Sequence, residues 1–232
     1  MLTRIAPIGT CRVFLPIRNL QQRGLARLIA ARNYGYVHSA PEVLQQARFM
    51  TSEVESIPEN LFPVIATVAA DAPRLAARLF QPDVYLVEIS SRRAFKDASG
   101  WYLQFNLLQE SKDYEAEFVS VTNNPLKDYM MQITDLLGAH RVCFVTHINA
   151  VATNGAPLPA RSSLIEAITQ IGGDLGVPVI DPTELLDMFA QRDLLKKDGT
   201  DLNHYSETAT EIVGDFYLQK LQELGRSKAV AA

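Results

Sequence analysis

The sequence predicts a three-layer α/β/α sandwich built on a parallel sheet of about five strands. Two observations favour this fold class. Short apolar runs recur along the chain, and longer segments with helical spacing separate them. The runs stay apolar through their middle instead of alternating, which is typical of strands that are buried on both faces of a parallel sheet. The expected strands are residues 4–8, 34–38, 83–90, 141–147 and 177–181.

The segments between and after these strands have the apolar spacing of amphipathic helices. Right-handed crossovers would place these helices on both faces of the sheet. The helix that follows the first strand is expected to begin near Pro16. The expected helices are residues 20–31, 41–49, 72–80, 126–137, 162–175, 183–192 and 206–224.

Residues 96–124 interrupt this alternation, and we interpret them as an insertion. Residues 100–106 look extended, with 117–121 as their partner, so the insertion is expected to be a hairpin or lid. Such a long connection is more often functional than idle, although surface padding or an oligomer contact is an equal alternative. We assign residues 1–225 to one domain and residues 226–232 to a C-terminal tail.

The composition is that of an ordinary globular protein, with 232 residues, 47% hydrophobic and 21% charged. The 22 basic and 26 acidic residues give a net charge of -4, with no basic cluster that would attract nucleic acid. No export signal is visible, and no apolar run reaches the ~18 residues of a membrane span. Only Cys11 and Cys143 are cysteines. We therefore expect reduced thiols, a cytoplasmic location and neither a nucleic-acid nor a membrane partner.

The candidate site residues follow the predicted strands, because ligands of open parallel sheets bind beyond the carboxyl ends of the strands. A thiol in a turn at such an end is a strong nucleophile once it is ionised, which singles out Cys11. Cys143 lies inside an apolar run and is expected in the core. The other residues at these ends are Gly9, Thr10, Arg12, His38, Ser90, Ser91, Arg92, His147 and Asn149.

A second motif, Asp201-x-x-His204, precedes the last predicted helix. A carboxylate at this spacing can fix the tautomer of the imidazole and stabilise the imidazolium, so that His204 acts as a general base. The alternative is that Asp201 or Ser206 only caps the last helix.

Together, the two motifs resemble the SGNH (GDSL-like) hydrolase superfamily. The first block of that family, usually Gly-Asp-Ser, corresponds here to Ile8-Gly9-Thr10-Cys11, and its last block to the stretch from Asp201 to Ser206. The resemblance implies a flavodoxin-like fold and acyl chemistry, since members are esterases, thioesterases, lipases, carbohydrate deacetylases and O-acyltransferases.

The sequence also departs from the family. Cys11 replaces the serine, as in subgroups that are associated with polysaccharide or other surface-glycan modification. Ser90, Ser91 and Arg92 stand where the family supplies an oxyanion-hole asparagine; Arg92 could stabilise an oxyanion, bind a substrate anion or form a surface ion pair.

Asn149 is another candidate amide donor to the oxyanion, and His38 and His147 are candidate pocket walls. A different register of the last block would use Asp198 as the acid and leave no histidine.

The leading hypothesis is an esterase or O-acyltransferase with Cys11 as nucleophile, His204 as base and Asp201 as orienting acid. The backbone amides of Cys11 and Arg12 would form the oxyanion hole. We further expect Cys11 to be a thiolate at neutral pH, activated by His204 and Arg12.

The substrate is expected to be a small-molecule or carbohydrate ester. The hypothesis requires no cofactor. No metal is expected, because the histidines lack the short spacing of zinc ligands. An acetyl-coenzyme A donor is an alternative to hydrolysis, and the cations available for its phosphates are Arg92, Arg93, Lys96 and Arg161.

A rival hypothesis is a binding module that kept the crevice and lost the chemistry. In it, Trp101, Tyr102 and Phe105 would stack on a glycan or a nucleotide-like ligand. A homodimer is compatible with either hypothesis.

Overall fold

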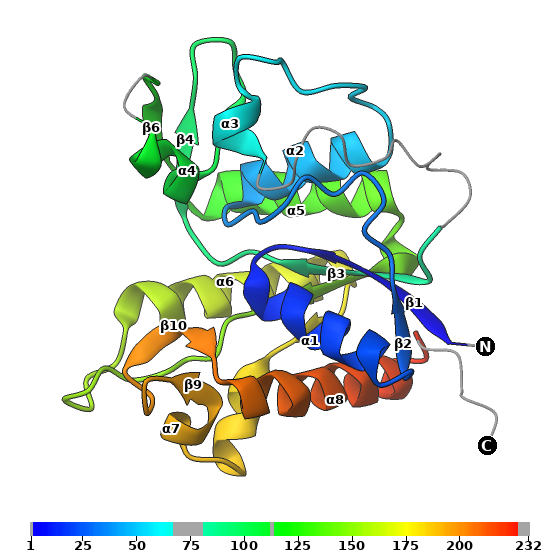
Figure 1. Cartoon of the computed structure of the whole chain (residues 1–232), viewed down its shortest axis with the longest axis vertical. Coiled ribbons are helices and arrows are strands. Elements are labelled where there is room, and N and C mark those ends of the chain that lie inside the picture. Colours follow the sequence, from blue (N-terminus) through cyan, green and yellow to red (C-terminus); the bar gives the residue numbers. More distant parts are fainter. Residues whose placement is uncertain (1, 67–80, 112–113, 227–232) are drawn as a thin grey trace.

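The computed structural model describes residues 2–66, 81–111 and 114–226 and has a parallel five-stranded sheet at its centre (Figure 1). The strand order is β2-β1-β3-β7-β8, so the predicted fold class is confirmed. The sheet strands are β1 (Thr3–Ile8), β2 (Ala26–Leu28), β3 (Val84–Glu88), β7 (Val142–Val145) and β8 (Val179–Ile180).

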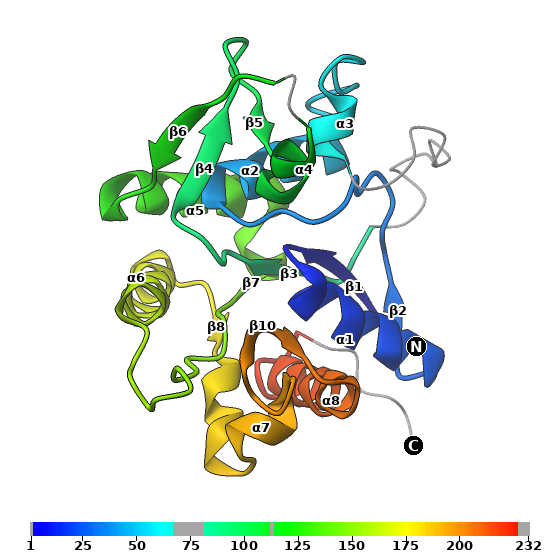
Figure 2. The ribbon, with the colours of Figure 1, turned by 60° about the vertical axis from the view of Figure 1, so that its left-hand side comes forward.

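Helices cover both faces of this sheet, as Figures 1 and 2 show. On β7, Val142 and Phe144 join the core under α2, α5 and α6, whereas Cys143 and Val145 join the core under α1 and α8. This alternation explains why the strands read as continuous apolar runs. The long helices are α1 (Cys11–Gln22), α2 (Ala40–Met50), α5 (Asn123–Leu137), α6 (Pro159–Leu175) and α8 (Glu207–Glu223).

The prediction of the second strand at 34–38 and of a helix at 20–31 is wrong. Helix α1 begins at Cys11, passes through Pro16 and is followed by Gly24 in the left-handed region with φ 72°. The chain then pairs with β1 over β2. Residues 34–38 are apolar for another reason. Tyr34 is buried against Phe49 of α2, with 5.5 Å between ring centroids.

Of two other expected helices, one differs from the structure and the other cannot be compared with it. Residues 183–192 do not form one helix, because the chain there makes a 3₁₀ helix, Pro182–Asp187, and then the short α7 (Gln191–Leu194). The expected helix at 72–80 lies outside the described residues. A further 3₁₀ turn, Ala139–Arg141, precedes β7, and the short α3 (Phe62–Ile65) follows α2.

The predicted insertion, residues 96–124, contributes most of a small antiparallel sheet with the order β5-β4-β6, beside α2 and α3; the sheet begins before it, at Arg93 (Figure 2). The expected pairing of 100–106 with 117–121 is wrong, because β4 lies between the two segments and pairs with both. Its elements are β4 (Arg93–Lys96), β5 (Tyr102–Leu103), α4 (Phe105–Glu110) and β6 (Glu117–Ser120).

A two-stranded hairpin, β9 (Leu195–Lys196) and β10 (Asp201–Tyr205), precedes α8. The hairpin and the small sheet β5-β4-β6 lie on opposite sides of the central sheet (Figure 2). Among the described helices, none combines the length and the apolar character needed to cross a bilayer.

Candidate active site

The carboxyl ends of β1 and β3 form the point at which the order of the sheet reverses. The chain leaves β1 toward β2 on one side and returns through β3 on the other. In parallel sheets this is where a crevice for ligands opens. The turn Gly9-Thr10-Cys11 follows β1 directly, and Glu88 ends β3.

Cys11 is the first residue of α1, and Thr10 caps that helix. The Thr10 hydroxyl accepts a hydrogen bond from the Arg12 amide at 3.3 Å. The expectation that this helix begins near Pro16 is therefore wrong. Gly9 has φ 150°, and a Cβ at this position would lie 2.6 Å from the Cβ of Glu88. Only glycine lets the turn pass so close to β3.

Glu88 is a buried carboxylate that holds this turn, with only 1% of the residue exposed. Its Oε2 accepts the Thr10 amide at 2.8 Å and the Thr10 hydroxyl at 2.6 Å. Its Oε1 accepts from Nε of Arg12 at 2.7 Å. Burial acts to lower the pKa of Arg12, but the charges of Glu88 and Tyr205 and the hydrogen bond to Glu88 together outweigh burial and raise that pKa. A buried charge pair thus fixes the segment that carries the thiol.

Arg12 also reaches the strand that carries His204. Its Nη1 donates to the backbone carbonyl of Asn203 at 3.0 Å. One guanidinium therefore contacts both the end of β3 and the residue before His204.

Asp201 and His204 meet as the spacing predicts, although they lie on β10 and not at a helix entry. Nδ1 of His204 lies 3.0 Å from both carboxylate oxygens of Asp201. Regular strand alternation would put positions three apart on opposite faces. The register between β9 and β10 shifts at this point, and the Asn203 amide donates to Oδ1 of Asp201 at 3.1 Å.

The electrostatics favour an ionised Asp201. Burial acts to raise its pKa, but hydrogen bonds from His204 and Asn203 outweigh burial and hold the pKa below its ordinary value. Ser206 caps α8 by accepting from the Ala209 amide, so the helix cap does not need Asp201. Asp198 is exposed in the turn between β9 and β10 and has φ 52°.

The surroundings of Cys11 favour its neutral thiol, whereas the sequence led us to expect a thiolate at neutral pH. Burial raises its pKa above the ordinary value, and this outweighs the opposing charge of Arg12. Within the described residues, no hydrogen bond joins Cys11 to His204. The arrangement suits removal of the proton by His204 during attack, as in serine enzymes, more than a preformed ion pair.

The rate of Cys11 alkylation should therefore rise about tenfold per pH unit from pH 7 to beyond pH 9, because only the thiolate reacts. Iodoacetamide labelling followed by intact mass measures this rate. Cys143 is an internal control, since burial raises its pKa to about 12 and the side chain is fully covered. A rate that is already on a plateau at pH 7 would contradict the raised pKa.

The candidate amide donors to an oxyanion have different surroundings. The Arg12 amide donates to the Thr10 hydroxyl, and the Cys11 amide lies at the N-terminus of α1. The backbone amide of Asn149 donates to the Thr183 hydroxyl, and the side-chain oxygen of Asn149 accepts from the Ser162 hydroxyl.

The three residues that were singled out after β3, Ser90 to Arg92, each lie near hydrogen-bond partners in neighbouring segments. Ser90 lies 3.4 Å from Nδ1 of His38, and Ser91 exchanges hydrogen bonds with the backbone of Arg93. Arg92 donates to Val121, Asn123 and Ser163. It lines a pocket of about 490 Å³ at the N-terminus of α5, whose lining does not include Cys11 or His204.

The surroundings of both candidate wall histidines, His38 and His147, favour the neutral imidazole. Burial lowers the pKa of His38. Burial, followed by the charges of Arg12 and Arg161, lowers the pKa of His147 well below its ordinary value. Nδ1 of His147 lies 2.9 Å from the Ile148 carbonyl and must donate to it, because a carbonyl only accepts.

The cations named for a coenzyme A donor have separate environments. Arg93 lies over the rings of Phe105 and Phe118. Arg161 donates to the Ile148 carbonyl and to Oδ1 of Asn203 at 3.1 Å. Burial, and then the charge of Arg12, lower the pKa of Arg161 to about 10.

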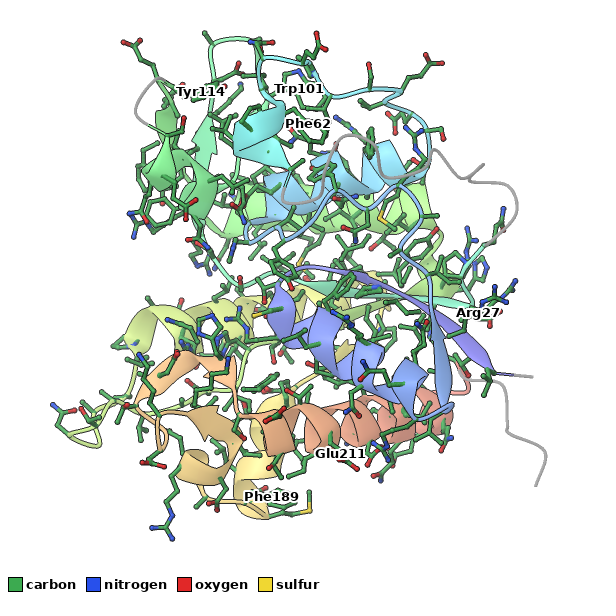
Figure 3. The ribbon with its side chains drawn as sticks, in the orientation of Figure 1. Arg27, Phe62, Trp101, Tyr114, Phe189 and Glu211 are labelled. Atoms are coloured by element: carbon green, nitrogen blue, oxygen red, sulfur yellow. The ribbon has the colours of Figure 1, made fainter. Side chains whose placement is uncertain are left out.

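The aromatic residues that the binding-module hypothesis uses pack against other side chains of the protein. Trp101 and Tyr102 lie against the core, and the Tyr102 hydroxyl lies 3.0 Å from that of Tyr129. Figure 3 shows Trp101 near Phe62, in the part of the molecule away from β10. Phe105 stacks on Phe95 with 5.1 Å between centroids.

Sequence reasoning missed Glu88 and Asn203. Glu88 had a signal, since it is an acidic residue that ends the apolar run Val84–Glu88. Asn203 had none, because its role depends on two distant arginines. Among the described residues, no group of three or more His, Cys, Asp or Glu side chains is placed to hold a metal ion.

A family model described as the TviD N-terminal domain matches this chain over residues 3–113 and 113–220. The chain belongs to the TviD N-terminal domain family. A relative, the Vi polysaccharide biosynthesis protein TviD of Salmonella typhi, is 27% identical over 91% of the chain. The chain spans 30% of the length of that relative.

Solved structures share the fold. A lipase/acylhydrolase from Enterococcus faecalis has a TM-score of 0.56 and 15% identity, and each chain is covered over 100% of its length. A putative lipolytic protein of the G-D-S-L family from Desulfitobacterium hafniense has a TM-score of 0.53 and 11% identity, over 94% of this chain and 98% of that one. The resemblance to the SGNH (GDSL-like) fold is thereby confirmed.

Proposed function

We propose that this protein transfers acyl groups to or from a carbohydrate ester through a covalent intermediate on Cys11. The observation that carries the proposal is the Asp201–His204 pair, which a single guanidinium links to the turn of Cys11. The fold shared with a lipase/acylhydrolase supports acyl chemistry, and the relationship to a polysaccharide biosynthesis protein supports a carbohydrate substrate.

In the proposed first step, Sγ of Cys11 attacks the acyl carbonyl carbon while its proton passes to Nε2 of His204. Nδ1 of His204 faces Asp201, which fixes the tautomer that leaves Nε2 able to accept. The oxyanion of the tetrahedral intermediate accepts a hydrogen bond from the Cys11 amide at the N-terminus of α1.

The leaving alcohol or thiol then takes the proton from His204, and a thioester remains on Cys11. In the second step, water or a sugar hydroxyl gives a proton to His204 and attacks the thioester. Water completes hydrolysis, and a sugar hydroxyl completes O-acyl transfer. Both outcomes return the thiol to Cys11, so one site serves either reaction.

The test is intact mass after exposure to p-nitrophenyl acetate and, separately, to acetyl-coenzyme A. The native protein should gain one acetyl group, and Cys11→Ala should gain none. His204→Ala should gain it about 10²–10⁴-fold more slowly, the usual contribution of a general base. Preference between the two donors distinguishes a hydrolase from a transferase.

Cys143→Ala is the matched control, because it removes the other thiol, which lies in the core. It should acquire the acetyl group at the native rate. A folded native protein that acquires no adduct from either donor would contradict the proposal and favour a non-catalytic binding module.

A further inference from the structure

The proposed reaction needs a thiol and an imidazole that come from opposite ends of the chain. Cys11 lies on α1, and His204 lies on β10. Proton transfer requires the two groups to approach within hydrogen-bond reach of each other. Packing does not fix the imidazole, because 49% of the His204 side chain is exposed.

Within the described residues, the hydrogen bond that joins the turn of residues 9–12 to β10 is the one from Arg12 to the Asn203 carbonyl. The same guanidinium is also bound to the end of β3. Arg12 is buried, and its Nε donates to Glu88, the carboxylate that accepts from the amide and the hydroxyl of Thr10. The position of Arg12 is therefore set by the end of β3.

Asn203 is fixed from two further directions. Its amide donates to Asp201, and its side-chain oxygen accepts from Arg161 of α6. The residue next to it in the chain is His204, whose ring bonds to the same Asp201 carboxylate. A shift of the Asn203 backbone would therefore move the imidazole and its carboxylate together.

We infer that Arg12 is a positioning residue, which sets the distance between the Cys11 thiol and the His204 imidazole by spanning Glu88 and Asn203. We call this chain of contacts, Glu88–Arg12–Asn203, the Arg12 strut. The inference rests on the proposed function, since it concerns the geometry of the same two groups. A misplacement of about 1 Å in an active site is enough to cost roughly 100-fold in rate.

The test removes the strut without leaving a buried charge unpaired. The double variant Arg12→Met with Glu88→Gln eliminates both charges, while the Gln oxygen can still accept from Thr10. Replacing a buried ion pair by uncharged groups of similar size is often tolerated. The matched control is Arg23→Met with Asp215→Asn, which removes a surface ion pair between the residue that follows α1 and α8.

The readout is the rate at which p-nitrophenyl acetate acetylates Cys11, with and without His204→Ala. In the native and control backgrounds, His204→Ala should slow acetylation by about 100-fold or more. In the background without the strut, acetylation should already be slow, and His204→Ala should cost less than about threefold. Such non-additivity is the sign of two groups that act together.

An equal effect of His204→Ala in all backgrounds would overturn the inference and leave the proposed function intact. No effect of His204→Ala in the native protein would instead overturn the proposed function. If the double variant fails to fold, Arg12→Lys replaces it. A lysine keeps the charge beside Glu88 but lacks the planar fork that reaches two acceptors, so it should show the same loss of coupling.

Discussion

Glu88→Ala should lower the free energy of unfolding by about 3–5 kcal/mol, the usual result of breaking a buried ion pair from one side. The carboxylate accepts three hydrogen bonds, two from Thr10 and one from Arg12. Alanine would leave the guanidinium buried beside no opposite charge. It would also leave the Thr10 amide and hydroxyl without their acceptor.

Urea unfolding followed by circular dichroism measures this change. Asp215→Ala is the control, because it also removes the carboxylate of an arginine pair, but one at the surface, where half of the Asp215 side chain is exposed. It should cost less than about 1 kcal/mol. If the two variants were destabilised equally, the Arg12–Glu88 pair would not contribute the stability that its burial implies.

Asp201→Asn should slow the acetylation of Cys11 by roughly 10²–10⁴-fold. The comparable substitution in a serine triad costs about 10⁴-fold, because the wrong tautomer of the histidine is then favoured. A neutral amide cannot stabilise the imidazolium that forms when His204 takes the thiol proton. The effect should fall on the acetylation rate constant, with little loss of stability, because the side-chain oxygen of asparagine can still accept from the Asn203 amide.

Stopped-flow release of p-nitrophenol in the first turnover measures the acetylation rate. Asp198→Asn is the matched control, since it makes the same change in the turn of the same hairpin and should leave the rate unchanged. The opposite pattern, with Asp198→Asn slow and Asp201→Asn unchanged, would support the other register of the last block.

The local sequence determined the strands and helices whose burial leaves a recognisable apolar pattern. Strands β1, β3 and β7 were predicted because both of their faces are covered, which produces continuous apolar runs. Helices α2, α5, α6 and α8 follow from apolar spacing. The Asp201–His204 contact was also predictable, because its partners are three residues apart.

The strand β2 was missed because it is only three residues long and its backbone pairing with β1 creates the strand. The signal available in the sequence was Gly24, because a glycine in the left-handed region commonly ends a helix. Burial of Tyr34 under α2 instead produced an apolar run that imitated a strand.

Only the tertiary structure decided how the candidate site is held together. Arg12 meets Glu88 across 76 residues of sequence and Asn203 across 191. A buried charge needs a partner, but the sequence does not say which distant group supplies it. The sequence by itself thus determined the candidate groups and most of the scaffold. The folded chain determined which distant residues hold these groups in place, because burial and long-range hydrogen bonds arise only when the sheet has brought the segments together.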